Sequence, residues 1–182
     1  MGIKREIYQL VVVGLSIWVV LSVTIQNYRV SGISMDPYLS AGDYLIVDKF
    51  NYLYLEGDIL DRIIPFKGIF DDTQYSFEMN APKRGDIVVF KDKFDSKYKI
   101  KYIFAEFNDW VDTSSVPPKI WIDNNNKNYL NKLTKLEHNT FYVLGYNEQM
   151  SKDSRHFGPI SYDQIIGKLI FRYYPFNSIR FF

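Results

Sequence analysis

One serine and one lysine carry the clearest potential for covalent chemistry in this sequence. Ser34 lies in residues 30–39 (VSGISMDPYL), a segment that follows almost directly on a long apolar run. A serine between glycine and proline can be an activated nucleophile, but such serines more often form turns with their hydroxyl bonded locally. This segment alone leaves both interpretations open.

A nucleophilic serine needs a base, and lysine is the more promising base here. The chain has only two histidines, His138 and His156, and both lie in polar, loop-like segments. A lysine can accept a proton only if burial or cationic neighbours keep its amine neutral near physiological pH. Lys101 lies in an apolar stretch and meets this requirement. Strand alternation would also put Lys99 on the same face, so a solvent-facing lysine pair is the competing interpretation.

Composition argues against several other kinds of site. The formal net charge is +1, so the chain has no basic excess to attract nucleic acid. No cysteine is present, which excludes disulfides, thiolate zinc sites and cysteine catalysis. The chain also lacks the short signatures of zinc peptidases, P-loops and dinucleotide sites. We therefore expect neither a metal nor a cofactor.

The N-terminal region predicts a membrane anchor that must precede any catalytic domain. Residues 7–25 contain no charged side chain and would span about 28 Å as a helix, close to the thickness of the bilayer hydrocarbon. The run is longer than a cleavable signal core, and no Ala-x-Ala-like site follows it. Lys4 and Arg5 would keep the N-terminus in the cytoplasm. We expect an uncleaved signal-anchor in residues 1–27, with residues 28–182 on the outer side.

The remainder of the chain predicts a mostly β domain. Short apolar or alternating runs are separated by turn residues, and no segment after the anchor has a clear helical period. The expected strands cover residues 44–47, 86–90, 98–104, 119–122, 141–144 and 165–174, with a hairpin turn at 123–126. This spacing favours a sandwich or small barrel. Residues 52–80 lack regular alternation and are expected to form an inserted β-ribbon or long loop.

Several segments together resemble the type I signal peptidases, membrane-bound Ser/Lys proteases that remove signal peptides from exported preproteins. Residues 31–39 (SGISMDPYL) depart from the family pattern S-G-x-S-M-x-P-T-L only at Tyr38. Residues 42–49 resemble the strand that follows, and residues 82–90 (PKRGDIVVF) match P-x-R-G-D-[IV]-V-V-F nearly throughout. By this resemblance Ser34 is the nucleophile.

The same resemblance selects the general base. Residues 99–109 (KIKYIFAEFND) resemble the family segment Y-I-K-R-V-I-G-L-P-G-D and place Lys101, rather than Lys99, at its lysine. Tyr102 stands where the pattern has arginine, and the G-L-P-G turn is missing. The resemblance therefore implies a Ser34/Lys101 dyad.

A last segment implies residues that support the dyad. Residues 145–158 (GYNEQMSKDSRHFG) resemble the pattern G-D-N-R-x-x-S-x-D-S-R-x-x-G, with Tyr146 and Glu148 in place of aspartate and arginine. The resemblance implies that Ser151 hydrogen-bonds the lysine amine and that Asp153 and Arg155 form a supporting pair.

The resemblance also implies where a substrate would bind. The backbone N–H of Ser34, with help from the region of Gly32, would hold the oxyanion. The expected walls of the substrate pocket are Val30, Met35, Leu39 and Ile100.

The implied activity is cleavage of signal peptides from secreted and membrane preproteins at the bacterial cytoplasmic membrane. The bilayer and the protein-export machinery are the implied partners. A specialised maturation peptidase of the same fold, for example in a conjugation system, is one alternative. An inactive, membrane-tethered homologue that binds peptides is another.

Overall fold

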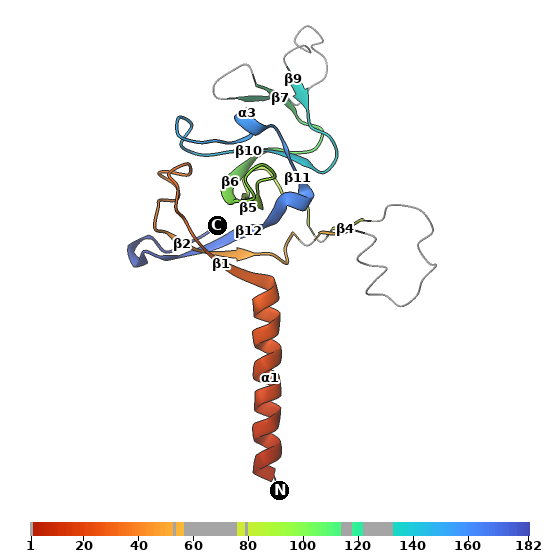
Figure 1. Cartoon of the computed structure of the whole chain (residues 1–182), viewed down its shortest axis with the longest axis vertical. Coiled ribbons are helices and arrows are strands. Elements are labelled where there is room, and N and C mark those ends of the chain that lie inside the picture. Colours follow the sequence, from red (N-terminus) through yellow and green to blue (C-terminus); the bar gives the residue numbers. More distant parts are fainter. Residues whose placement is uncertain (1, 53, 57–75, 79, 114–117, 122–132) are drawn as a thin grey trace, which may run out of the picture.

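A long helix carries a β-rich body at its C-terminal end (Figure 1). The computed structural model describes residues 2–52, 54–56, 76–78, 80–113, 118–121 and 133–182. The expected turn at 123–126 and most of the insertion at 52–80 lie outside these residues. The mostly β architecture after an apolar helix confirms the fold class expected from the sequence.

The helix α1 (Gly2–Thr24) is long and apolar enough to cross a membrane, judged by length and composition. Its apolar side chains are exposed on the isolated chain. The hydroxyls of Ser16, Ser22 and Thr24 each donate to the carbonyl four residues earlier, at 2.7–2.9 Å. Within hydrocarbon, such bonds would satisfy polar groups that have no water to bind.

No linker separates the helix from the sheet. The strand β1 (Ile25–Arg29) begins at the residue after α1, so the anchor boundary expected at residue 27 falls inside a strand. The backbone N–H of Lys49 donates to the Thr24 carbonyl at 2.8 Å, and Lys49 Nζ donates to the Ser22 carbonyl at 3.4 Å. These bonds satisfy carbonyls that the helix end would otherwise leave free. They also tie the helix directly to the β-rich body.

The main sheet is antiparallel, with strands ordered β1-β2-β12-β5-β6-β10-β11 and β13 paired to β12. Its other strands are β2 (Tyr44–Asp48), β5 (Ile87–Lys91), β6 (Tyr98–Ala105), β10 (Thr140–Leu144), β11 (Ile160–Ser161), β12 (Ile165–Tyr174) and β13 (Arg180–Phe181). The expected run 165–174 thus forms one strand over its whole length.

Smaller elements surround this sheet. A pair is formed by β3 (Tyr54–Glu56) and β4 (Ser76–Glu78), and a three-stranded sheet by β7 (Trp110–Asp112), β8 (Lys119–Trp121) and β9 (Leu133–Lys135). The short helices are α3 (Ser154–Phe157), η2 (Tyr162–Gln164) and η3 (Phe176–Ser178). β3 and β4 pair antiparallel, and both lie within residues 52–80, of which most are outside the described residues.

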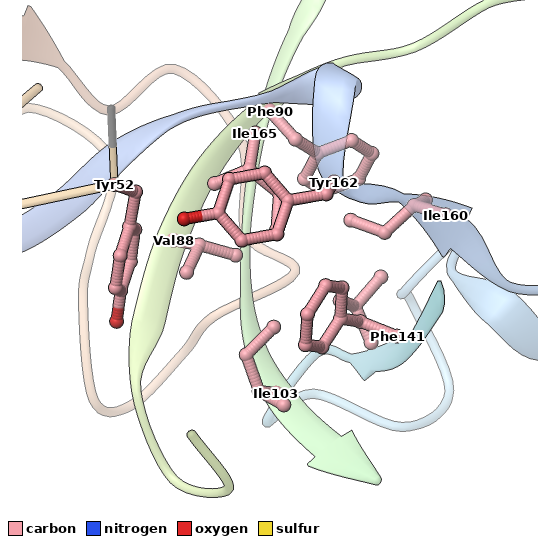
Figure 2. Packing of buried hydrophobic residues seen from close by; sticks show 9 residues of the cluster. Tyr52, Val88, Phe90, Ile103, Phe141, Ile160, Tyr162 and Ile165 are labelled. Carbon is pink, nitrogen blue, oxygen red and sulfur yellow. The ribbon is translucent and has the colours of Figure 1, made fainter. Parts of the chain in front are cut away.

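Both faces of the central strands are buried. Val88 and Phe90 of β5 pack with Ile103 of β6 in one cluster, where aromatic rings fill much of the space (Figure 2). Ile87 lies in a second cluster that includes Met35 and Leu39. Because alternate residues of a strand point to opposite faces, β5 contributes to both clusters. Lys101 of β6 lies beside these buried strands and is itself buried.

Candidate active site

The nucleophile candidate lies in a turn that two buried side chains hold in place. The segment between β1 and β2 is closed by backbone bonds from Val30 N to Asp43 O (2.9 Å) and from Gly42 N to Val30 O (2.8 Å). Within it, Met35 and Leu39 are almost wholly buried. Ser34 precedes Met35 and is half-buried. Its hydroxyl is therefore held at the edge of the core, where solvent and substrate can still reach it.

The base candidate meets this serine directly. Lys101 is only 3 % exposed, and its Nζ lies 2.5 Å from Ser34 Oγ. Lys99 has a different environment, since its amine pairs with Asp92 and lies 3.6 Å from Asp95. The alternative of two solvent-facing lysines therefore does not describe this strand. The amine of Lys101 and the hydroxyl of Ser34 have the contact that proton transfer requires.

Burial gives the lysine a suitable proton affinity. Removal from water is the main cause that lowers the pKa of Lys101 to about 8; Asp153 opposes this change, and nearby Lys99 and Arg155 contribute to it. Desolvation disfavours the charged amine because the ion loses its hydration. A substantial fraction of Lys101 is therefore neutral near physiological pH.

This pKa predicts how the reactivity of Ser34 depends on pH. Below pH 8, the rate of reaction with a serine-directed sulfonyl fluoride should fall about tenfold per pH unit, because only the neutral amine accepts the hydroxyl proton. The rate can be followed by the mass of the intact protein between pH 5.5 and 9.5, since roughly this range brackets the titration. A rate that stays level across the acidic half of this range would contradict the role of Lys101.

A buried carboxylate organises the region behind the dyad. Asp153 is fully buried and accepts bonds from Arg155 Nε (2.8 Å), Ser151 Oγ (2.6 Å) and Gly145 N (3.0 Å). Burial alone would raise the pKa of Asp153, but these donors outweigh it and hold the pKa below its ordinary value. Asp153 is therefore ionised and paired with Arg155, as expected.

Ser151 makes a different contact from the one expected. Its hydroxyl donates to Asp153, and no hydrogen bond from Lys101 to Ser151 is found in the described part of the chain. The Asp153 carboxylate is the stronger acceptor, because it is charged and lies only two residues away. Ser151 thus contributes to the network behind the lysine rather than touching its amine.

A glycine that sequence reasoning did not single out is essential to this packing. A Cβ on Gly145 would overlap the Ser34 carbonyl oxygen and the Ser151 hydroxyl. Two residues later in the same loop, the backbone N–H of Asn147 donates to the Ser34 carbonyl at 3.0 Å. Only glycine allows the loop to approach the nucleophile this closely. The sequence did contain a signal for this role, because Gly145 is the first residue of the segment 145–158 and matches the first glycine of the family pattern.

Comparison with known proteins identifies the family to which this chain belongs. A model of the signal peptidase family, peptidase S26, matches residues 3–112 and 114–174. The chain belongs to this family. Signal peptidase I of Bacillus caldolyticus is 31% identical over 173 residues, covering 85% of this chain and 82% of that protein. Signal peptidase IB of Staphylococcus aureus strain MRSA252 is 30% identical over 162 residues, covering 85% and 80%.

A cavity of about 220 Å³ opens beside Ser34 of this signal peptidase family member. Three of the four expected pocket residues line it, namely Val30, Met35 and Ile100, and so does Gly32. Leu39 does not line it, since this side chain packs wholly inside the core. The other lining residues were not expected in a pocket, and they include two cations; they are Tyr28, Arg29, Ser31, Leu45, Val89, Tyr98 and Lys99.

Neither histidine has a hydrogen bond or ion pair with Ser34 or Lys101 among the residues that the structure describes. His138 packs against Phe107, with ring centroids 5.1 Å apart, and His156 Nδ1 lies 3.9 Å from an oxygen of Asp153. Over the described ranges, no cluster of three or more His, Cys, Asp or Glu side chains could hold a metal ion. The polar chemistry beside the cavity rests on serine and lysine.

Proposed function

We propose that this protein is a signal peptidase, a serine endopeptidase that cleaves preproteins with a Ser34/Lys101 dyad. The observation that carries the proposal is the 2.5 Å contact between Ser34 Oγ and an amine whose pKa is lowered to about 8. Membership of the signal peptidase family supports the substrate class. Signal peptides of exported preproteins are thus the substrates proposed.

The proposed mechanism uses Lys101 twice. Its neutral amine takes the hydroxyl proton while Ser34 Oγ attacks the scissile carbonyl carbon. The resulting ammonium then protonates the departing amine, and an ester joins Ser34 to the N-terminal part of the substrate. Water, deprotonated by Lys101, attacks this ester; the bond to Ser34 Oγ breaks, Lys101 returns the proton to Oγ, and the acid is released. No metal or cofactor is needed to balance these steps.

The oxyanion would be held by backbone groups of the nucleophile segment. No acceptor for the Ser34 backbone N–H occurs in the part of the chain that the structure describes, so this donor is available to a substrate. Gly32 lies two residues away on the wall of the cavity. A preorganised donor of this kind typically stabilises the transition state by about 3 kcal/mol.

The substrate would bind in an extended conformation, with side chains entering the cavity beside Ser34. The apolar part of the cavity wall, at Val30, Met35 and Ile100, would contact apolar side chains of the substrate. We propose that the residues close to the cut are small, so that they fit against this wall beside Ser34.

The apolar helix would anchor this enzyme as a single-pass protein of the bacterial cytoplasmic membrane. Lys4 and Arg5 precede the apolar run, which favours an N-terminus in the cytoplasm. The β-rich body would then face outward, where translocated signal peptides emerge from the export machinery.

Cleavage of a purified preprotein tests this proposal. Wild-type enzyme in detergent or liposomes should yield two products whose masses place the cut at the end of the signal peptide. Ser34→Ala should yield neither, because it lacks the attacking oxygen. Intact preprotein after incubation with folded wild-type enzyme would refute the activity and favour an inactive, peptide-binding homologue.

A panel of substrates separates general from specialised processing. Several ordinary preproteins should be cut if the enzyme serves general secretion. Cleavage of a conjugation-system precursor alone would identify the specialised maturation peptidase, which would share the same dyad.

A further inference from the structure

Three tyrosines that depart from the family pattern meet in one aromatic stack. Tyr38 stands where the pattern has threonine, Tyr102 where it has arginine, and Tyr146 where it has aspartate. The ring of Tyr146 lies between the other two, with centroids 4.6 Å from Tyr38 and 4.6 Å from Tyr102. The interplanar angles are 19° and 36°. Departures separated by many residues in the chain thus meet at one place.

Each ring belongs to a segment that carries a part of the dyad or its support. Tyr38 follows Ser34 by four residues, in the same turn. Tyr102 follows Lys101 on β6, and alternation directs its ring to the opposite face of the strand from the amine. Tyr146 lies between Gly145, which donates to Asp153, and Asn147, which donates to the Ser34 carbonyl. The stack therefore joins the segments of nucleophile, base and supporting carboxylate.

Further contacts close the far side of the stack. The guanidinium of Arg180 lies 4.6 Å from the centroid of the Tyr38 ring, and the ring of Phe182 lies 5.6 Å from it. The backbone N–H of Phe182 donates to the Ile170 carbonyl at 3.1 Å, which fixes this end to β12. Tyr38 is thereby held between Tyr146 and elements anchored in the main sheet.

We propose that Tyr38, Tyr102 and Tyr146 are positioning residues, which hold the nucleophile turn and the base strand in register for the reaction. The inference rests on the proposed function. The family pattern carries opposite charges at positions 102 and 146, whereas this chain carries two rings that attract each other without charge. Aromatic pairs prefer defined relative orientations, so the stack can fix geometry in place of charged groups.

The alternative for Tyr146 is direct contact with substrate, since this ring is 41 % exposed. The two roles differ in kinetics. Loss of a positioning contact lowers kcat because the dyad is misaligned in every complex, whereas loss of a substrate contact raises KM.

Ring removal and ring retention at Tyr146 test the proposal. Tyr146→Ala should lower kcat by about 10- to 100-fold with KM changed less than about twofold, because misplacement of about 1 Å can cost a hundredfold. Tyr146→Phe keeps the ring and should stay within about twofold of wild type. Tyr174→Ala is the matched control, since Tyr174 is 44 % exposed and its ring centroid lies 5.6 Å from that of Tyr44 on the same sheet. The control should keep the wild-type kcat.

Restoring the family's residues gives a second, independent test. Tyr102→Arg and Tyr146→Asp should each lower kcat, because each destroys the stack and leaves one charge without its partner. The double variant should lose less than the product of the two single losses. Losses that simply multiply, a raised KM with unchanged kcat in Tyr146→Ala, or wild-type kinetics in that variant would overturn the proposal.

A readout without peptide substrate separates this inference from the proposed function. The rate at which Ser34 reacts with a sulfonyl fluoride at pH 9 should fall in Tyr146→Ala and recover in Tyr146→Phe, with thermal unfolding measured alongside. This outcome would support the stack even if wild-type enzyme cleaved no preprotein. A rate equal to wild type in folded Tyr146→Ala would refute the positioning role even if preproteins were cut.

Discussion

Replacing Lys101 with methionine is expected to lower kcat by about 10⁴-fold or more while leaving the free energy of unfolding equal to or above that of wild type. The loss of activity follows because Lys101 is the amine that contacts Ser34, at 2.5 Å. Stability should not fall, because methionine fills a similar volume and lacks an amine that must be desolvated. Opposite effects on activity and stability are typical of a buried group retained for chemistry.

Preprotein cleavage and urea denaturation of the same preparation measure the two effects. Lys99→Met is the matched control on the same strand. At pH 9.5 Lys101 should be largely neutral with or without the nearby Lys99 charge, so the control should keep most of its kcat there. It should lose stability, because the buried Asp92 carboxylate would then lack its lysine partner. Residual cleavage by Lys101→Met within tenfold of wild type would rule out Lys101 as the general base.

Replacing Gly145 with alanine should lower kcat per folded molecule by about a hundredfold, although the change adds only one methyl group. The added Cβ would overlap the Ser34 carbonyl oxygen and the Ser151 side chain. The nucleophile turn must therefore shift, and the contact between Ser34 and Lys101 must lengthen.

A second glycine provides the control for this substitution. A Cβ on Gly167 would overlap backbone atoms of Asp48, where β12 meets β2, and so would also cause strain. Gly167→Ala should lower the thermal stability, but the remaining folded enzyme should keep its kcat. The concentration of reactive serine, titrated with a sulfonyl fluoride, normalises both measurements. Equal specific activities of the two variants would show that Gly145 has no special relation to the site.

Local sequence signals predicted the parts of the fold whose burial follows a simple pattern. The run 165–174 is rich in apolar and aromatic residues and forms β12 over the same residues, and its burial alternates from Ile165 to Ile170. β1 (Ile25–Arg29) was not expected, because its sequence IQNYR is mostly polar and its side chains are exposed or only partly buried. This strand owes its structure to pairing with β2, a long-range contact that leaves no periodic signal in the sequence.

The residues of the candidate site likewise fall into those that the sequence predicted and those that only the structure reveals. Ser34 and Lys101 were found because each stands in a segment that matches the family pattern, and the structure brings them together. Leu39 was expected in the pocket but lies in the core, since one position in a turn does not reveal which way its side chain points. The contact of Tyr38 with Tyr146 joins residues more than a hundred positions apart, and only the folded chain reveals it.

The two hydrogen bonds from Lys49 to the end of α1 limit how far Ser34 can lie from the membrane. Because the helix runs into β1 without a linker and Lys49 fastens β2 to it, the dyad cannot swing away from the point where α1 ends. Ten residues separate Thr24 from Ser34, at most roughly 35 Å of extended chain. On the proposed topology, Ser34 is thus held at a fixed height above the membrane surface, and the enzyme diffuses only within the plane of the membrane. On the proposed function, the depth at which a signal peptide lies in the bilayer would then decide which of its peptide bonds reaches Ser34.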